Sequence, residues 1–223
     1  MVTLKAPVLS AEREQAPVPL DLVAVLDISG SMSGQKINLL KEAVKFIIRE
    51  LTDKDRLCLV IFNSSAQRLC PLTVMSAAGK EKLCAIMDRV HADGGTAIST
   101  GLHYALQVLK GRRHVNNVPS ILLLSDGQDG NPAAVRAMDV PYVLHSFGFG
   151  GDHDALLLGN IAEKAQGTFT FVEKFEVSIS SLFSRPSPKT TFSSFCTNRT
   201  FQIPLPLVWE VLPASLPSGS SSP

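Results

Sequence analysis

Residues 22–34 read Leu22-Val-Ala-Val-Leu-Asp-Ile-Ser-Gly-Ser-Met-Ser-Gly34. An apolar run stops at Asp27, and oxygen-bearing side chains follow at Ser29 and Ser31. An apolar run without polar alternation is typical of a strand that is covered on both faces, as in a parallel sheet. Ligands of open α/β sheets bind just beyond the carboxyl ends of such strands. We therefore expect these three polar side chains at a ligand-binding edge.

One carboxylate and two hydroxyls are hard ligands, which suit Mg²⁺ or Mn²⁺ better than zinc. A capped strand-to-helix turn explains the same pattern, because Asp and Ser also favour turns and caps. Two later segments favour the metal. Thr96 follows a Gly-Gly loop, and Asp126 ends a second apolar run at 121–125.

The order Asp-x-Ser-x-Ser, distant Thr, strand-end Asp resembles the metal-ion-dependent adhesion site of the von Willebrand factor A (vWA) domain family. The resemblance implies Mg²⁺ or Mn²⁺ as cofactor. It implies that two serines bind the ion directly and that the other residues do so directly or through water. Two carboxylates roughly neutralise a divalent ion, and an open position then attracts an acidic group of a partner protein. The implied metal residues are Asp27, Ser29, Ser31, Thr96 and Asp126.

Strand and helix patterns alternate along the chain, which predicts a doubly wound α/β fold with a mostly parallel sheet and right-handed crossovers. The resemblance implies a six-stranded, Rossmann-like sheet in the order 3-2-1-4-5-6. Ser33 is expected to cap the first helix. Strands are expected near 21–26, 57–62, 120–125, 142–149 and 168–172, and helices near 37–51, 83–90, 98–109, 132–138 and 154–166.

One further strand is expected at 67–74, running antiparallel at the edge of the sheet. Pro71 lies within it, and proline is tolerated in edge strands but not in central ones. A register in which paired residue numbers sum to 128 would place Cys58 opposite Cys70, but the sequence does not fix the register.

The chain has 223 residues, enough for one α/β domain. We expect an extended lead-in at 1–19 and a vWA domain at 20–180. Seven of the fourteen prolines lie after residue 183, and the chain ends in serine-rich sequence. Residues 181–223 are therefore predicted to form a disordered tail.

Bulk properties argue against several classes of function. A net charge of +1 without a basic stripe does not suit a nucleic-acid-binding protein. We find no signal-peptide pattern and no apolar stretch near the roughly 20 residues of a membrane span. The four cysteines form no CxxC pair, so they are expected to be reduced thiols in a cytoplasmic protein.

Within the vWA family, the chain is similar to plant proteins of the wavy-growth RING-finger ligase group. Segments 123–129 and 145–154 carry this likeness. Those proteins have a cysteine-rich RING before the vWA domain, and this chain has none of those cysteines. We therefore predict a non-enzymatic protein-interaction module. The alternative is a substrate-recruiting fragment or isoform of a plant RING-type E3 ubiquitin ligase.

A more remote alternative is a serine hydrolase. Ser33-Gly-Gln-Lys36 matches the S-x-x-K motif of penicillin-binding folds. That chemistry also needs S-D-N and K-T-G. The chain has Ser125-Asp-Gly127 and Lys189-Thr-Thr191 in their place, so both companion motifs are absent.

Overall fold

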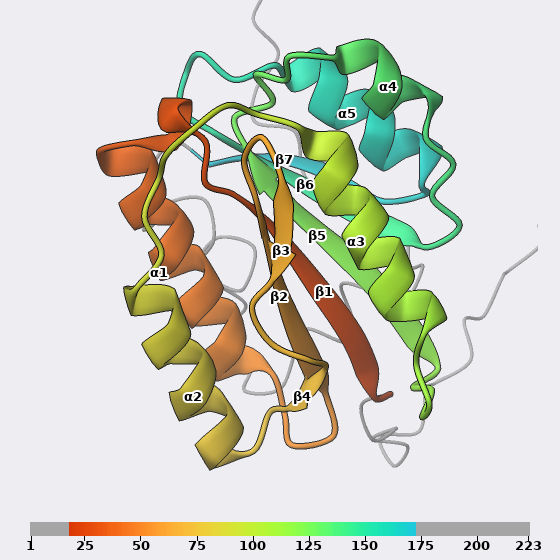
Figure 1. The fold of residues 1–223 in the computed structure, drawn as a ribbon. Helices are drawn as coiled ribbons and strands as arrows, with labels where there is room; N and C mark the ends of the chain where they lie inside the picture. The colour runs from red at the N-terminus through yellow and green to blue at the C-terminus, as the bar shows by residue number, and fades with distance from the viewer. Residues whose placement is uncertain (1–17, 173–223) are drawn as a thin grey trace, which may run out of the picture.

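The computed structural model describes residues 18–172, which form a mixed β-sheet between two layers of helices (Figure 1). The expected tail at 181–223 and nearly all of the expected lead-in lie outside the described residues. No helix within 18–172 has the length and apolar character to cross a membrane.

The secondary structure alternates as the sequence predicts. Its elements are β1 (Leu20–Asp27), a 3₁₀ turn η1 (Gly30–Met32), α1 (Gln35–Glu50), β2 (Arg56–Phe62), β3 (Ala66–Arg68), β4 (Thr73–Val74), α2 (Ala77–Asp88), α3 (Ile98–Lys110), β5 (Val118–Ser125), α4 (Pro132–Ala137), β6 (Val143–Phe149), α5 (Ala155–Lys164) and β7 (Phe169–Val172).

The strands are ordered β3-β2-β1-β5-β6-β7, and β4 also pairs with β2. Neighbours from β2 through β7 are parallel, whereas β3 and β4 run antiparallel to β2. The predicted doubly wound α/β class is therefore confirmed. Because β1 lies between β2 and β5, its carboxyl end is next to theirs.

The edge of the sheet differs from the prediction, since the sheet has seven strands and not six. The single edge strand expected at 67–74 is split into β3 and β4. Paired residue numbers sum to 128 in β3, as for Val60 with Arg68, but to 130 in β4, as for Leu57 with Thr73. The register shifts across the segment that holds Pro71, which has no backbone N–H to continue the ladder.

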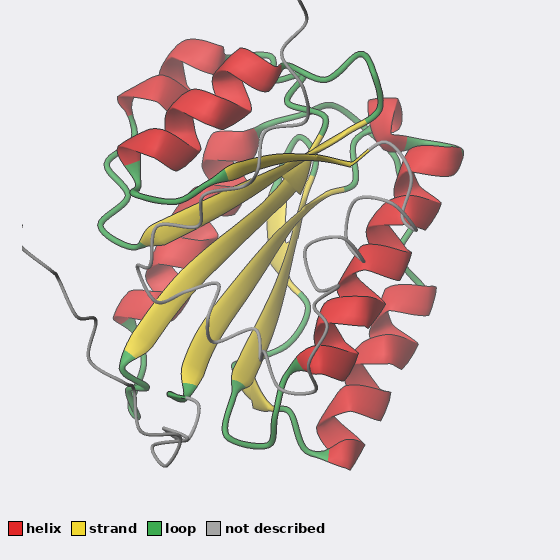
Figure 2. Cartoon of the chain, turned by 180° about the vertical axis from the view of Figure 1, so that it is seen from behind, coloured by secondary structure: helices red, strands yellow, loops and turns green. Residues whose placement is uncertain are grey.

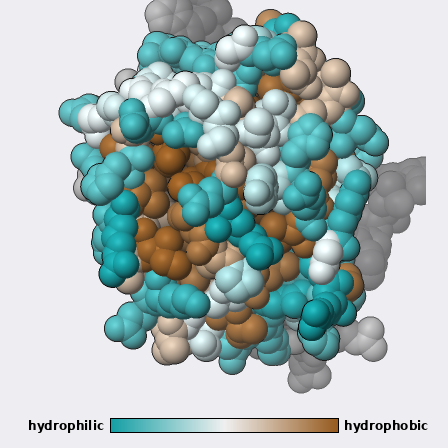
Figure 3. Space-filling model, viewed as in Figure 1, coloured by the Kyte–Doolittle hydropathy of each residue, from teal (hydrophilic) through white to brown (hydrophobic). Residues whose placement is uncertain are grey.

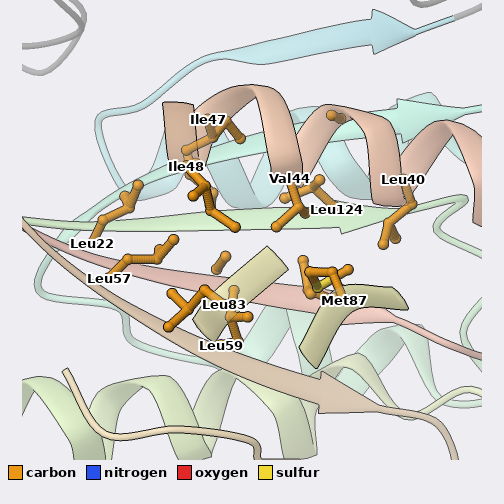
Figure 4. Packing of buried hydrophobic residues seen from close by; sticks show 14 of the residues in the cluster. Leu22, Leu40, Val44, Ile47, Ile48, Leu57, Leu59, Leu83, Met87 and Leu124 are labelled. Atoms are coloured by element: carbon orange, nitrogen blue, oxygen red, sulfur yellow. The ribbon is translucent and has the colours of Figure 1, made fainter. Parts of the chain in front are cut away.

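Apolar side chains alternate between the two faces of the sheet and form two cores. On one face, α1 and α2 pack over β1 and β2, and the other face is covered by α3, α4 and α5 (Figures 1 and 2). The helical spacing of Leu40, Val44 and Ile48 presents one side of α1 to the sheet. Figure 4 shows Ile48 toward Leu22 and Val44 beside Leu124, with Leu40 farther along the same side of the helix.

The start of α1 corrects one expectation. Gly34 precedes the helix with a positive φ of 76°, and no side chain caps it. Ser33 instead closes the preceding 3₁₀ turn, where its N–H donates to the Gly30 carbonyl. The turn uses the Ser33 backbone, so its hydroxyl does not have the expected capping role.

Candidate functional site

Two strands deliver carboxylates to the same edge of the sheet. Asp27 is the last residue of β1, and Asp126 directly follows β5, the neighbouring parallel strand. Both side chains are fully buried. This edge is the upper one in Figure 1, where the loops before α1, α3 and α4 meet. The carboxyl ends of parallel strands thus bring together two residues that lie 99 positions apart.

Neutral donors hold the Asp27 carboxylate. Oδ1 accepts a hydrogen bond of 2.9 Å from the Ser29 N–H, and Oδ2 accepts one of 2.5 Å from the Ser125 hydroxyl. Burial raises the pKa of Asp27 to about 6, against the effect of these hydrogen bonds, and repulsion from Asp126 adds to the rise. Asp27 is thus a carboxylate whose charge is under-compensated by its neighbours.

The two predicted serines lie next to each other in the loop after β1. Their Oγ atoms are 3.0 Å apart, with Ser29 buried and Ser31 exposed. The 3₁₀ turn brings them close, because it begins at Gly30 between them and its Met32 side chain is anchored in the core. One hydroxyl therefore faces the interior and the other faces the surface of the same loop.

The loop that carries Thr96 is tied to both neighbouring loops through its backbone. Asp93 N–H donates to Ile28 O at 2.7 Å, and Gly94 O accepts from Gly30 N–H at 2.8 Å. On its other side, Thr96 O accepts from Gly130 N–H at 3.4 Å. The structure therefore places the Thr96 loop between the Ser29–Ser31 loop and the loop after Asp126.

Asp126 has a cationic neighbour, whereas Asp27 has none among residues 18–172. Lys36 Nζ lies 3.1 Å from Asp126 Oδ2 and 2.8 Å from Asp152 Oδ1. Gln128 Nε2 donates to Asp152 Oδ2 at 3.1 Å. Burial alone lowers the pKa of Lys36, but the hydrogen bonds that Lys36 donates to Asp152 and Asp126 outweigh this effect and raise the pKa overall. Lys36 therefore stays protonated.

The donor set fits a hard divalent cation. Two fully buried carboxylates and two adjacent hydroxyls are all oxygen donors, the type that Mg²⁺ prefers. Lys36 compensates Asp126, but within residues 18–172 no cationic side chain forms an ion pair with Asp27. Buried carboxylates are normally paired or bound to a metal. Among the described residues, Asp27 is thus the carboxylate of this edge that has no cationic partner, while Lys36 is shared between Asp126 and Asp152.

Sequence reasoning missed two residues that shape this site. Ser125 donates to Asp27 and also accepts the Gly127 N–H at 2.9 Å, so its hydroxyl links β1 to the loop after β5. Lys36 enters the sequence interpretation only as the lysine of the S-x-x-K motif. A hydroxyl directly before a strand-end Asp was the one available signal for Ser125, whereas nothing in the sequence pairs Lys36 with Asp126.

Asp129 has a structural role in the loop after β5. Its Oδ2 accepts the Ile98 N–H at 2.5 Å at the start of α3, and its Oδ1 accepts the Asn131 N–H at 2.6 Å. The carboxylate therefore joins the loop after β5 to α3 and fixes the position of the Thr96 loop.

Comparison with known proteins agrees with the predicted fold. The model of the von Willebrand factor type A domain matches residues 21–185. E3 ubiquitin-protein ligase WAVH1 of Arabidopsis thaliana is 34% identical over 136 residues, which are 56% of this chain and 20% of that protein. E3 ubiquitin-protein ligase WAV3 is 40% identical over 111 residues, or 49% of this chain and 15% of its own length. The chain thus spans about a fifth or less of these relatives.

Solved structures share the fold. A von Willebrand factor type A protein from Catenulispora acidiphila aligns with a TM-score of 0.63 and 24% identity, covering 72% of this chain and 40% of that one. Proximal thread matrix protein 1 from the mussel byssus aligns with a TM-score of 0.58 and 24% identity, covering 74% and 44%. Together with the family match over most of its length, these observations show that the chain belongs to the von Willebrand factor type A domain family.

Proposed function

We propose that this vWA domain binds one Mg²⁺ or Mn²⁺ at the carboxyl edge of its sheet and, through it, an acidic group of a partner protein. Domains of this family are commonly protein-interaction modules. The observation that carries the proposal is the pair of buried carboxylates, Asp27 and Asp126, of which only Asp126 has a cationic neighbour among the described residues.

The five proposed metal residues differ in charge and exposure, and their roles differ accordingly. Asp27 and Asp126 supply the negative charge that attracts a cation, while Ser29, Ser31 and Thr96 supply neutral oxygens. The bound ion would keep part of its positive charge and attract a carboxylate. Ser31 is exposed, so a partner would approach the ion from the side of this residue. The loops at 127–131 and 150–153 flank the site and would contact the rest of the partner.

Affinity capture from a plant extract with the immobilised chain tests this function. We expect bound protein to be retained in Mg²⁺, released by EDTA and rebound when Mg²⁺ is restored. Thr96→Ala should lose the partner. Thr100→Ala is the matched control, because its hydroxyl donates to the Ala97 carbonyl within α3. Substituting alanine for single Asp or Glu residues of the partner should identify one carboxylate that is essential. Capture that persists in EDTA, or in Thr96→Ala, would contradict the proposal.

A second function is favoured by the likeness to the two Arabidopsis ligases. In this version the same site recruits a protein that a RING-bearing ligase then ubiquitylates. The chain's four cysteines do not form a RING pattern, so its contribution would be recognition and not ubiquitin transfer.

A fusion experiment separates recruitment from simple binding. A partner captured in Mg²⁺ should be ubiquitylated in vitro when the chain is fused to an active RING domain, and Thr96→Ala in the fusion should abolish the modification. Equal ubiquitylation by the variant would mean that the vWA site does not select the substrate.

The hydrolase alternative gains no support from the site. A base that activates Ser33 would have to lose its proton, whereas the carboxylates of Asp126 and Asp152 raise the pKa of Lys36. Lys36 is better described as a counter-charge of Asp126.

A further inference from the structure

A groove separates the edge strand β3 from helix α3, away from the carboxyl edge of the sheet. It has a volume of about 450 Å³ and is lined by Gln67, Arg68, Tyr104, Gln107, Val108 and Gly111. In Figure 1, β3 and α3 lie side by side on the side facing the viewer. In the same view, Figure 3 shows hydrophobic areas on both sides of a hydrophilic strip near the middle of this face. The groove therefore offers apolar and polar contacts together.

β3, whose Gln67 and Arg68 line this groove, has an outer edge of backbone groups. Among the described residues, no strand pairs with that edge. Bonds from Asn63 N–H to Ser65 O and from Leu69 N–H to Leu59 O show that the odd-numbered residues of this hairpin bond inward, to β2. Alternation in an antiparallel ladder then turns the N–H and C=O of Ala66 and Arg68 outward. Such an edge is a template for an added strand.

Both walls of the groove lie in stretches of sequence without acidic residues. No Asp or Glu occurs between Asp55 and Glu81, which includes β3, or between Asp93 and Asp126, which includes α3. The same stretches contain Arg68 and Lys110, both exposed. Positive charge at the groove is therefore not balanced by neighbours in the sequence, and an occupant with negative charge is favoured.

We propose that an extended acidic segment of a partner protein binds in this groove by adding a strand to β3. Its backbone pairs with the outward groups of Ala66 and Arg68. Alternate side chains of the added strand point to opposite faces, so one set contacts Tyr104 and Val108 on α3 while carboxylates meet Arg68. Tyr104 suits this role, because it is 40% exposed in the described structure and aromatic side chains often anchor interfaces.

This binding mode does not need the metal site. Pairing uses the edge of β3 and the side of α3, whereas Asp27, Ser29 and Asp126 lie beyond the carboxyl ends of β1 and β5. Failure of either proposal therefore leaves the other intact. A peptide that binds in EDTA reports on the groove alone.

A synthetic probe tests the pairing without altering the protein. The probe is a short peptide of alternating valine and glutamate with blocked ends and a fluorescent label. Two N-methylated versions carry methyl groups on alternate amides, either on the set that faces β3 or on the opposite set. We expect one version to lose binding and the other to keep it, because only one set of N–H groups donates to an edge strand.

Protein variants test the charge and the location. Arg68→Glu should weaken binding about tenfold or more, since reversing one charge places like charges together. Arg136→Glu, an exposed change on α4, is the matched control and should bind normally. NMR amide shifts on probe binding in EDTA should concentrate at 64–68 and 104–111. Absence of binding, equal binding of both N-methylated probes, or shifts centred on the metal loops would each overturn the proposal.

Discussion

Each end of β1 carries a buried aspartate, and the two aspartates differ in whether cationic side chains balance their charge. Asp21, at the amino end, and Asp27, at the carboxyl end, are both fully buried. Asp21 receives two hydrogen bonds of 2.7 Å from Arg56 and one of 2.7 Å from Arg112. Asp27 receives the Ser29 backbone N–H and the Ser125 hydroxyl, which are neutral donors.

The pKa values express this difference. Burial alone raises the pKa of Asp21, but the hydrogen bonds from Arg56 and Arg112 outweigh it, and the pKa lies below its usual value of 3.8. Burial raises the pKa of Asp27 to about 6, because its hydrogen-bond donors do not compensate the loss of solvent. The Asp21 carboxylate is neutralised by two arginines, whereas no cationic side chain within residues 18–172 forms an ion pair with Asp27. Burial alone therefore does not distinguish a structural carboxylate from a binding one.

The largest expected effect comes from removing the self-contained carboxylate. Asp21→Ala leaves the nearly buried Arg112 and Arg56 without their partner, and breaking such a pair costs about 3–5 kcal/mol of unfolding free energy. Urea denaturation in EDTA measures it. Asp27→Asn in the same buffer should change stability by no more than about 1 kcal/mol, because it leaves no cation unpaired. Equal losses of unfolding free energy in the two variants would show that Asp21 and Asp27 do not differ in how their charge is balanced.

Low pH should reduce the stability that Asp21 contributes at the amino end of β1. The folded pKa of Asp21 is depressed, so its contribution is fully present above the unfolded value of 3.8 and is lost as the pH falls through the lower folded value. The difference in stability between wild type and Asp21→Asn should therefore be constant above about pH 5 and shrink below pH 4. Denaturation curves across this range measure the difference. A stability difference that grows as the pH falls would show that the folded pKa of Asp21 is raised and not lowered.

Mg²⁺ should stabilise the fold only through the carboxyl end of β1, where Asp27 lies. At a Mg²⁺ concentration of about 100 times Kd, a ligand that binds only the folded state adds about 2.7 kcal/mol. We expect wild type and Asp21→Asn to gain this increment and Asp27→Asn to lose it. Thermal unfolding with and without Mg²⁺ measures the gain. An increment that survives Asp27→Asn would place the ion elsewhere.

A smaller effect on Mg²⁺ affinity is expected from substituting Lys36, which supplies the positive charge beside Asp126. Lys36→Met removes the ammonium from Asp126 and should tighten Mg²⁺ binding by up to about tenfold, near 1.4 kcal/mol. Lys36→Arg keeps the charge and is the conservative control. Weaker binding in Lys36→Met would mean that Lys36 holds Asp126 in position and does not oppose the cation.

Much of the fold is readable from the sequence, because apolar runs and helical spacing record which faces are buried. The run at 22–26 and the spacing of Leu40, Val44 and Ile48 predict β1 and α1 directly. The split between β3 and β4 is not readable in the same way. Pro71 signals an edge, but only the register shows that the ladder moves by two residues there.

Part of the candidate site, like part of the fold, can be predicted from the sequence. The five predicted residues lie on three loops whose backbones are tied together, and the family pattern anticipates that grouping. Ser125 and Lys36 were missed for a physical reason. Alternation along β5 says only that residues 125 and 126 point apart, and the contact between Lys36 and Asp126 spans 90 positions that only the folded loops bring together.

The most direct test of the central claim is a calorimetric titration of Mg²⁺ into the chain, with Asp126→Ala and the exposed-surface control Asp139→Ala alongside. We expect one site per chain in wild type and in Asp139→Ala, and no measurable heat of binding in Asp126→Ala. Undiminished Mg²⁺ binding in Asp126→Ala, or none in wild type, would contradict it.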